Sequence, residues 1–219
     1  HGDAVDAFRE ATVVSPTFEP AWEALISLYI DRKNNYELSL IYEEMIKKIG
    51  RRGPYLTELC KINTQERIYP TAIKYCKEAQ AKNPQDADSM VYLGLAYRNS
   101  EQLEQGANTL KNAATQFTDS ELAQVTYAQH LSEEKNYIDA YTHFLAATQI
   151  NDKNIDSLVG LGTAAAKIKK IDESLAAFTK ACKINRSAGV GLRKAASEFF
   201  KTNQKEEYNK LMELSEKCQ

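Results

Sequence analysis

The chain repeats one pattern of large and small side chains every 34 residues. A column of mostly large residues at this spacing holds Leu25, Leu59, Leu93, Tyr127, Leu161 and Ala195, and a column of mostly small ones holds Ala11, Met45, Ala79, Ala113, Ala147, Ala181 and Ser215. The register continues without insertion from Ala4 to Ser215. A period of this length indicates one supersecondary unit copied along the chain, in which each copy buries its apolar face against the next.

The unit that begins at Ala87 is the clearest copy. Its first half carries Met90, Leu93, Gly94 and Tyr97, and its second half carries Gly106, Leu110 and Ala113. Spacings of three and four residues place each set on one face of a helix. Small residues would let two antiparallel helices approach closely, while the large ones fill the space around the contact. No stretch alternates with period two, so we predict no strands.

This order of large and small residues resembles the tetratricopeptide repeat (TPR), over essentially the whole chain. The resemblance implies an all-α fold, a right-handed superhelical α–α solenoid of antiparallel helix hairpins. We predict a single TPR array with a half-repeat at 1–18 and full repeats at 19–52, 53–86, 87–120, 121–154, 155–188 and 189–219. The half-repeat has no first helix, so we expect a longer protein that extends upstream. Ile26 and Leu38 are large where small residues are usual, which predicts a splayed helix pair.

Composition and motifs argue against several classes of function. A formal net charge of −2 gives no reason to expect binding to nucleic acid. No apolar run approaches the roughly 20 residues that a membrane-spanning helix needs, so we expect no membrane insertion. The sequence has no phosphate-binding loop, no Gly-x-Ser-x-Gly motif and no metal-ligand spacing around His1, His130 and His143. We therefore predict no enzyme activity, no cofactor and no metal.

The four cysteines leave two interpretations open. Cys60 and Cys76 face each other across one predicted hairpin. Cys182 and Cys218 lie on the second helices of the last two repeats. Free cysteine packs like a small apolar residue, which suits four thiols in a reducing cytoplasm. A Cys60–Cys76 disulfide would instead indicate a periplasmic or other extracytoplasmic location. The sequence favours the cytoplasm unless that disulfide forms.

A partner site is expected on the first helices, which line the concave side of proteins that resemble this one. The middle repeats present an apolar wall there and the last repeat is basic. The predicted site consists of Tyr92, Leu95, Arg98, Asn99, Val125, Gln129, Val159, Thr163, Arg193 and Lys194. Exposed apolar strips usually mark partner sites, so a peptide would place apolar residues on this wall and an acidic group near the basic end. The alternative is that these apolar residues only pack neighbouring first helices together.

Three classes of function follow from this pattern. The leading prediction is a non-catalytic adaptor that binds another protein or a peptide segment in the concave groove. The alternative is a structural component that self-associates through its open N-terminal end, at Ala4 and Phe8. An enzyme would need a catalytic constellation, and the sequence offers none.

Overall fold

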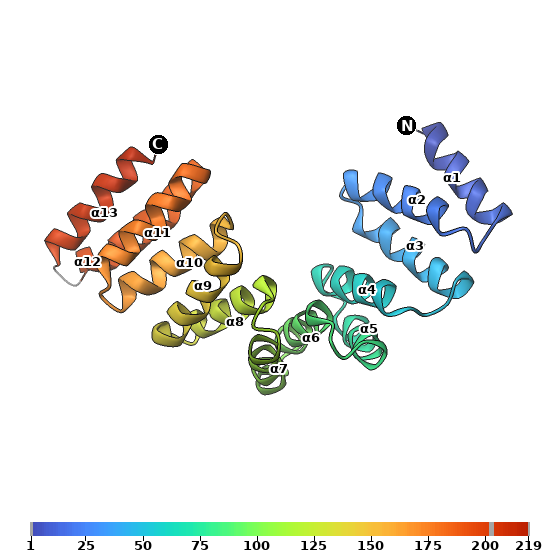
Figure 1. Ribbon diagram of the computed structural model, residues 1–219, viewed down its shortest axis with the longest axis horizontal. Coiled ribbons are helices and arrows are strands. Elements are labelled where there is room, and N and C mark those ends of the chain that lie inside the picture. Colours follow the sequence, from blue (N-terminus) through green and yellow to red (C-terminus); the bar gives the residue numbers. More distant parts are fainter. Residues whose placement is uncertain (1, 202–203, 219) are drawn as a thin grey trace. The chain divides into compact units, whose positions relative to one another are not determined.

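The computed structural model describes residues 2–201 and 204–218. Within those ranges it contains thirteen α-helices, one short 3-10 helix and no strand (Figure 1), so the predicted all-α class is confirmed. The helices are α1 (Gly2–Val14), α2 (Glu19–Asp31), α3 (Asn35–Lys48), α4 (Gly53–Gln65), α5 (Tyr69–Lys82), α6 (Ala87–Asn99), α7 (Leu103–Gln116), α8 (Glu121–Glu133), α9 (Tyr137–Ile150), α10 (Ile155–Lys167), α11 (Ile171–Ile184), α12 (Gly189–Lys201) and α13 (Lys205–Lys217), with the 3-10 helix η1 (Arg186–Ala188) before α12.

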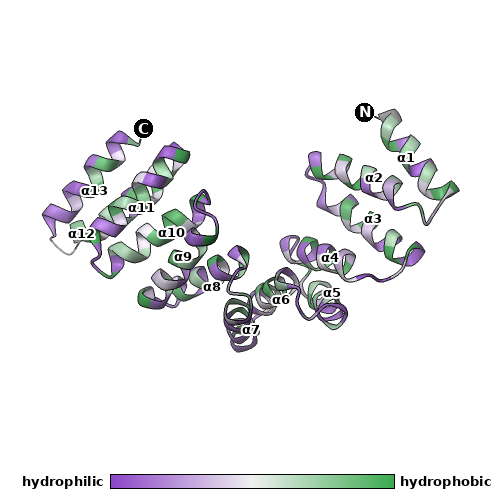
Figure 2. Ribbon diagram, in the orientation of Figure 1, coloured by the Kyte–Doolittle hydropathy of each residue, from purple (hydrophilic) through white to green (hydrophobic). Residues whose placement is uncertain are grey.

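Local sequence explains where these helices begin. The first helices start 34 residues apart, from Glu19 to Gly189, which is the period of the sequence. Side-chain oxygens that accept a hydrogen bond from the first helical turn are supplied by Asn34, Asp86, Ser120, Asn136 and Asn154. Such caps satisfy N–H groups that have no partner inside the helix. Hydrophilic and hydrophobic residues alternate along each helix, as expected for helices with one buried face (Figure 2).

The turn between the two helices of a hairpin is also repeated. One residue has a positive φ in each of the five hairpin turns that the structure describes throughout: Lys33 (53°), Arg67 (61°), Glu101 (66°), Lys135 (61°) and Lys169 (64°). The next N–H donates to a carbonyl five residues back, as from Asn34 to Tyr29 (3.1 Å) and from Asn136 to Leu131 (2.8 Å). This left-handed helix ending usually uses glycine, but this chain uses long polar residues.

The chain divides into two compact units, His1–Leu110 and Lys111–Gln219. In the first unit, α5 packs closely against both α4 and α6. Its core is centred on the fully buried side chains of Trp22, Leu25, Met45, Leu56 and Leu59. Helices α2 and α3 pack less closely than α4 and α5, as expected if large residues at Ile26 and Leu38 hold the pair apart.

The second unit contains three hairpins, α8–α9, α10–α11 and α12–α13. Helix α9 packs on α10, and α10 contacts both α8 and α12, so the first helices form one layer of this unit. Phe144, Phe178, Leu192 and Leu211 are buried in its core. The Ser174 hydroxyl donates a hydrogen bond to the Gly162 carbonyl (2.7 Å), which ties α11 to α10 where the two helices come close.

Candidate functional site

The partner-site residues predicted from the sequence, from Tyr92 to Lys194, are called the predicted face. They are divided between the two units, and the first of them lie on α6. Tyr92 is half-buried and packs against the core of the first unit. Burial, with Asp88 and Glu58 nearby, raises the pKa of its hydroxyl. Leu95 and Arg98 are half-buried and Asn99 is exposed. This part therefore offers partly accessible apolar and polar groups on one helix.

The valines of the second part are largely occupied by packing. Val125 on α8 is 8% exposed and belongs to the core of the second unit. Val159 on α10 is half-buried, and a Cβ placed on Gly191 of α12 would lie 2.6 Å from its Cγ1 atom. These two side chains fit the alternative reading, in which they hold neighbouring first helices together. Gln129 is exposed and Thr163 is half-buried.

The basic end of the predicted face lies on α12, where both Arg193 and Lys194 are exposed. The Arg193 guanidinium donates a hydrogen bond to the Ser215 hydroxyl on α13 (3.1 Å), so it is held toward α13. Phe200, on the same helix, is 68% exposed and its ring centroid lies 5.3 Å from that of Tyr208. Helix α12 therefore presents an exposed aromatic ring and an exposed lysine to solvent.

A pocket of about 170 Å³ lies between α10 and α12 in the second unit. We call it the α10–α12 pocket; its lining is Thr163, Ala166, Lys167, Lys169, Ala195, Phe199 and Gln204. Of these residues, only Thr163 was predicted as a site residue from the sequence. Ala195 and Phe199 occupy core positions of the repeat, and their partial access to a pocket depends on how α10 and α12 pack.

A groove of about 270 Å³ lies between α3 and the α4–α5 turn of the first unit. We call it the α3 groove. Tyr36, Leu40 and Ile68 line it, and all three are exposed although large and apolar. These residues were not predicted from the sequence, because they lie outside both the core columns and the predicted face. They could have been identified from the sequence as large apolar residues at repeat positions that are usually polar and exposed to solvent.

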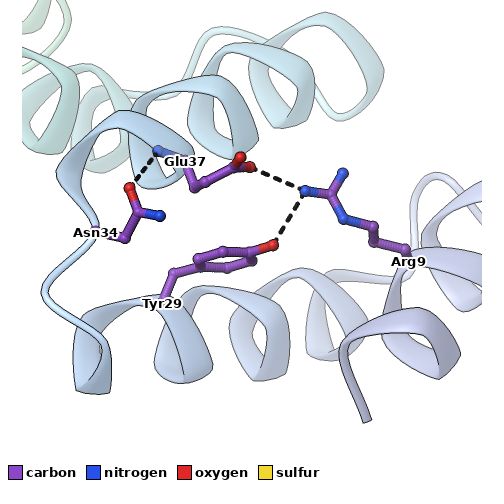
Figure 3. Close-up of polar contacts among 4 residues, drawn as sticks. All are labelled: Arg9, Tyr29, Asn34 and Glu37. Carbon is purple, nitrogen blue, oxygen red and sulfur yellow. Dashed lines mark hydrogen bonds and ion pairs between the residues drawn. The ribbon is translucent and has the colours of Figure 1, made fainter. Parts of the chain in front are cut away.

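Helix α1 is joined to the next hairpin by polar contacts (Figure 3). The Arg9 guanidinium donates to the Tyr29 hydroxyl (3.2 Å) and to the Glu37 carboxylate (3.0 Å). The hydrogen bond to Tyr29 is the main cause that raises the pKa of Arg9, and the Glu37 carboxylate acts in the same direction. Asn34 caps α3 by accepting from the Glu37 N–H (3.2 Å). Self-association through this N-terminal half-repeat, at Ala4 and Phe8, stays a prediction.

Two disulfides join helices within the units. Cys60–Cys76 joins α4 to α5 (Cα–Cα 4.9 Å), across the hairpin considered from the sequence. Cys182–Cys218 joins α11 to the end of α13 (Cα–Cα 5.4 Å). This second pairing was not predicted from the sequence. All four cysteines are therefore paired.

Two searches of the described residues have negative results. No group of three or more histidine, cysteine or acidic side chains among them is arranged to hold a metal ion. Within the same part of the chain, no helix combines the length and apolar character that crossing a membrane requires.

Comparison with known proteins gives structural matches only. No protein-family model matches the chain, and no curated protein does. Among solved structures it is similar to a chain of the APC/C hetero-tetramer Cut9–Hcn1, with a TM-score of 0.71 and 14% identity over 89% of this chain and 39% of that chain. For yeast Tom70 the values are 0.65 and 16%, over 96% and 45%. For YrrB, "a TPR protein with an unusual peptide-binding site", they are 0.52 and 16%, over 82% and 93%.

These likenesses and the 34-residue hairpins define the class: the chain has the TPR fold, as the sequence predicted. It spans less than half of the matched Cut9–Hcn1 and Tom70 chains, and most of YrrB. At these identities the likeness concerns the fold, and function has to be argued from the surfaces of this chain.

Proposed function

We propose that this chain is a non-catalytic scaffold that binds another protein through a peptide segment laid against the first helices of the second unit. The observation that supports this most directly is the α10–α12 pocket, whose lining includes Thr163 of the predicted face. The TPR fold supports it in general, and YrrB is described as having a peptide-binding site.

The chemistry of the pocket suits a peptide with an apolar and an acidic group. Ala166, Ala195 and Phe199 form apolar walls, whereas Lys167 and Lys169 contribute positive charge to the lining. An apolar side chain buried there gains roughly 1.5–3 kcal/mol from leaving water. A carboxylate beside the lysines adds charge complementarity, which contributes mainly to specificity and to the rate of association. We thus keep the expected acidic group but place it beside Lys167 and Lys169 and not beside Arg193 and Lys194, and we place the apolar side chain in the pocket.

The test uses a partner captured by affinity purification with the full chain. Thr163→Trp should fill the mouth of the pocket and weaken binding at least tenfold, because the site is blocked while the core is untouched. Thr163→Ser is the matched control, since it keeps the hydroxyl that donates to the Val159 carbonyl (2.8 Å). Equal affinity of the folded Thr163→Trp protein and the wild type would reject the pocket.

The α6 part of the predicted face is tested separately. We propose that Tyr92 and Leu95 add to partner binding, because both are partly accessible. Changing both to alanine should then lower affinity for the captured partner, measured by calorimetry beside the Thr163 variants. Unchanged affinity would remove α6 from the site and leave the pocket unaffected.

We also infer that the chain resides in an oxidising compartment. Disulfides persist in such compartments and are rare where glutathione and thioredoxin keep thiols reduced. Pairing of all four cysteines into two disulfides supports an extracytoplasmic location over the cytoplasmic one. Protein isolated under acid quench and treated with an alkylating reagent should show no modified cysteine before reduction. Alkylation of all four without reductant would contradict the inference.

A further inference from the structure

The α3 groove carries an inference about a second interaction surface, distinct from the one proposed above. It lies between one face of α3 and the turn from α4 to α5, within the first unit. Ile62 of α4 is 4% exposed and forms part of its floor. Tyr36 and Leu40 stand on the α3 side and Ile68 on the turn side, exposed by 70%, 44% and 51% respectively.

Three large apolar side chains around one depression are unusual for a solvated surface. Single exposed apolar residues are common, but clusters rimmed by polar groups mark places where another molecule binds. The 34-residue pattern does not require them, because the buried columns of these two repeats are already filled, by Leu38 and Tyr42 in the first and by Cys76 in the second. Their presence therefore has no explanation in the packing of the hairpins.

The walls of the groove are held in place before anything binds. The Asn35 amide donates to the Glu66 carboxylate (2.9 Å), joining the start of α3 to the end of α4. The Tyr75 hydroxyl donates to the Glu43 carboxylate (3.0 Å), joining α5 to α3. The Cys60–Cys76 disulfide fixes α4 to α5 below the turn. A preformed site loses less entropy on binding than one that must be ordered first.

The charges in the groove are all of one sign. Its only charged lining residues are Glu43 and Glu66. Neither forms an ion pair with a described residue, although each accepts one hydrogen bond. Glu43, with Leu40, also lines a neighbouring depression on the α1 side of α3 that contains Lys47 and Lys48, whereas Glu66 does not. An occupant that covers the α3 groove would leave at least the Glu66 carboxylate without a countercharge unless it brings a cation.

We propose that the α3 groove binds a peptide segment of a partner protein in which a large apolar side chain is flanked by lysine or arginine. The apolar side chain packs among Tyr36, Leu40 and Ile68, and the cation lies against Glu43 or Glu66. This is the opposite charge preference from that of the α10–α12 pocket. The two surfaces therefore select different segments, and failure of one leaves the other standing.

The experiment selects ligands from a random 12-residue peptide library displayed on phage, with the full oxidised chain as bait. Sequenced binders should include a class that combines Leu, Ile, Phe or Trp with Lys or Arg. A synthetic peptide of that class is then titrated by fluorescence anisotropy. The double variant Leu40→Ser, Ile68→Ser should bind it at least tenfold more weakly, because both side chains are exposed and their loss does not open the core.

Two controls distinguish the groove from general surface hydrophobicity and charge. Leu103→Ser removes a side chain that is 64% exposed on α7, outside the groove, and should leave the affinity unchanged. Glu43→Gln with Glu66→Gln keeps the accepting oxygens for Tyr75 and Asn35 but removes both charges. It should weaken the basic peptide several-fold at low salt and leave a neutral analogue, with its cations replaced by glutamine, unaffected.

Three results would overturn the proposal. One is a selection that yields no apolar and basic class of binders. Another is an affinity that survives in the Leu40→Ser, Ile68→Ser protein, shown to be folded by its circular dichroism. The third is a peptide whose affinity falls with Thr163→Trp and not with the groove variant, which would assign it to the α10–α12 pocket.

Discussion

At the residue scale, packing decides what each position can hold. Gly94 and Gly162 lie where the two helices of a hairpin approach closely: a Cβ would lie 2.8 Å from Leu110 at Gly94 and 2.8 Å from Phe178 at Gly162. Packing also fixes the orientation of buried polar groups. The Gln124 amide donates to the Ala114 carbonyl (2.7 Å), so its oxygen faces Nδ1 of His143 (2.7 Å) and that nitrogen must carry the proton.

Gly162→Ala tests the close approach directly. The added methyl group should push the Phe178 ring and cost about 1–3 kcal/mol by overpacking, which outweighs the helix preference of alanine. Urea unfolding measures the change. Phe178→Leu in the same chain should recover part of the loss, because the shorter side chain leaves room. A neutral or stabilising Gly162→Ala would mean that the hairpin is looser than described.

His143 makes the free energy of unfolding depend on pH, and the sign of the effect follows from the shift of its pKa. Burial lowers its pKa below the ordinary 6.5, against the opposing charge of Asp139. The unfolded chain therefore binds a proton at a pH where the folded chain does not. This contribution to stability is present above pH 6.5 and is lost as the pH falls toward the folded pKa. Compared with His143→Gln, the wild type should lose more unfolding free energy between pH 7 and pH 5. Parallel curves for the two proteins would contradict this.

At the element scale, the recurrent units are the hairpin, its turn and its covalent links. The turn uses the same left-handed residue and the same hydrogen bond in each described copy. The long polar side chains suit a turn that is exposed to solvent. A positive φ is nevertheless strained for a residue with a Cβ, and glycine would relieve that strain. The disulfides act over different distances along the chain, 16 residues for Cys60–Cys76 and 36 for Cys182–Cys218.

Lys135→Gly should stabilise the second unit. Glycine removes the strain of the left-handed backbone, but it also gives the unfolded chain more conformational entropy. We expect a net gain of about 0.5–1 kcal/mol in unfolding free energy. Lys135→Val should act in the opposite direction, because a β-branched residue adopts positive φ poorly. The midpoint of urea unfolding measures both. A loss of stability with glycine would show that the lysine side chain itself supports the turn.

Removing a disulfide should cost more stability when the loop it closes is longer, although the cost grows only with the logarithm of loop length. Loop-closure entropy predicts about 3 kcal/mol for Cys60–Cys76 and about 4 kcal/mol for Cys182–Cys218. We expect the Cys182→Ala, Cys218→Ala protein to unfold at lower urea than the Cys60→Ala, Cys76→Ala protein. The reverse order would indicate that packing around the fully buried first pair, and not loop length, sets the cost.

At the scale of the whole molecule, the chain consists of two units, and the depressions on their surfaces differ in charge. The second offers an apolar pocket lined with lysines, and the first an apolar groove lined with glutamates. A scaffold with two such surfaces can hold two different segments. The single array predicted from the sequence, with its boundaries, stays a prediction. The predicted partner face falls partly in each unit, and we describe it unit by unit.

The sequence by itself determined the helices, their order and their pairing. A fixed spacing of large and small residues specifies which faces must be buried, and caps and turns specify where helices begin and end, so these features are local. The tertiary structure alone decided which side chains remain accessible. Val125 had the pattern of a surface residue and is buried, whereas Leu40 and Ile68 had no assigned role and line a groove. Exposure and the Cys182–Cys218 pairing depend on helices from different repeats, whose contacts no single period encodes.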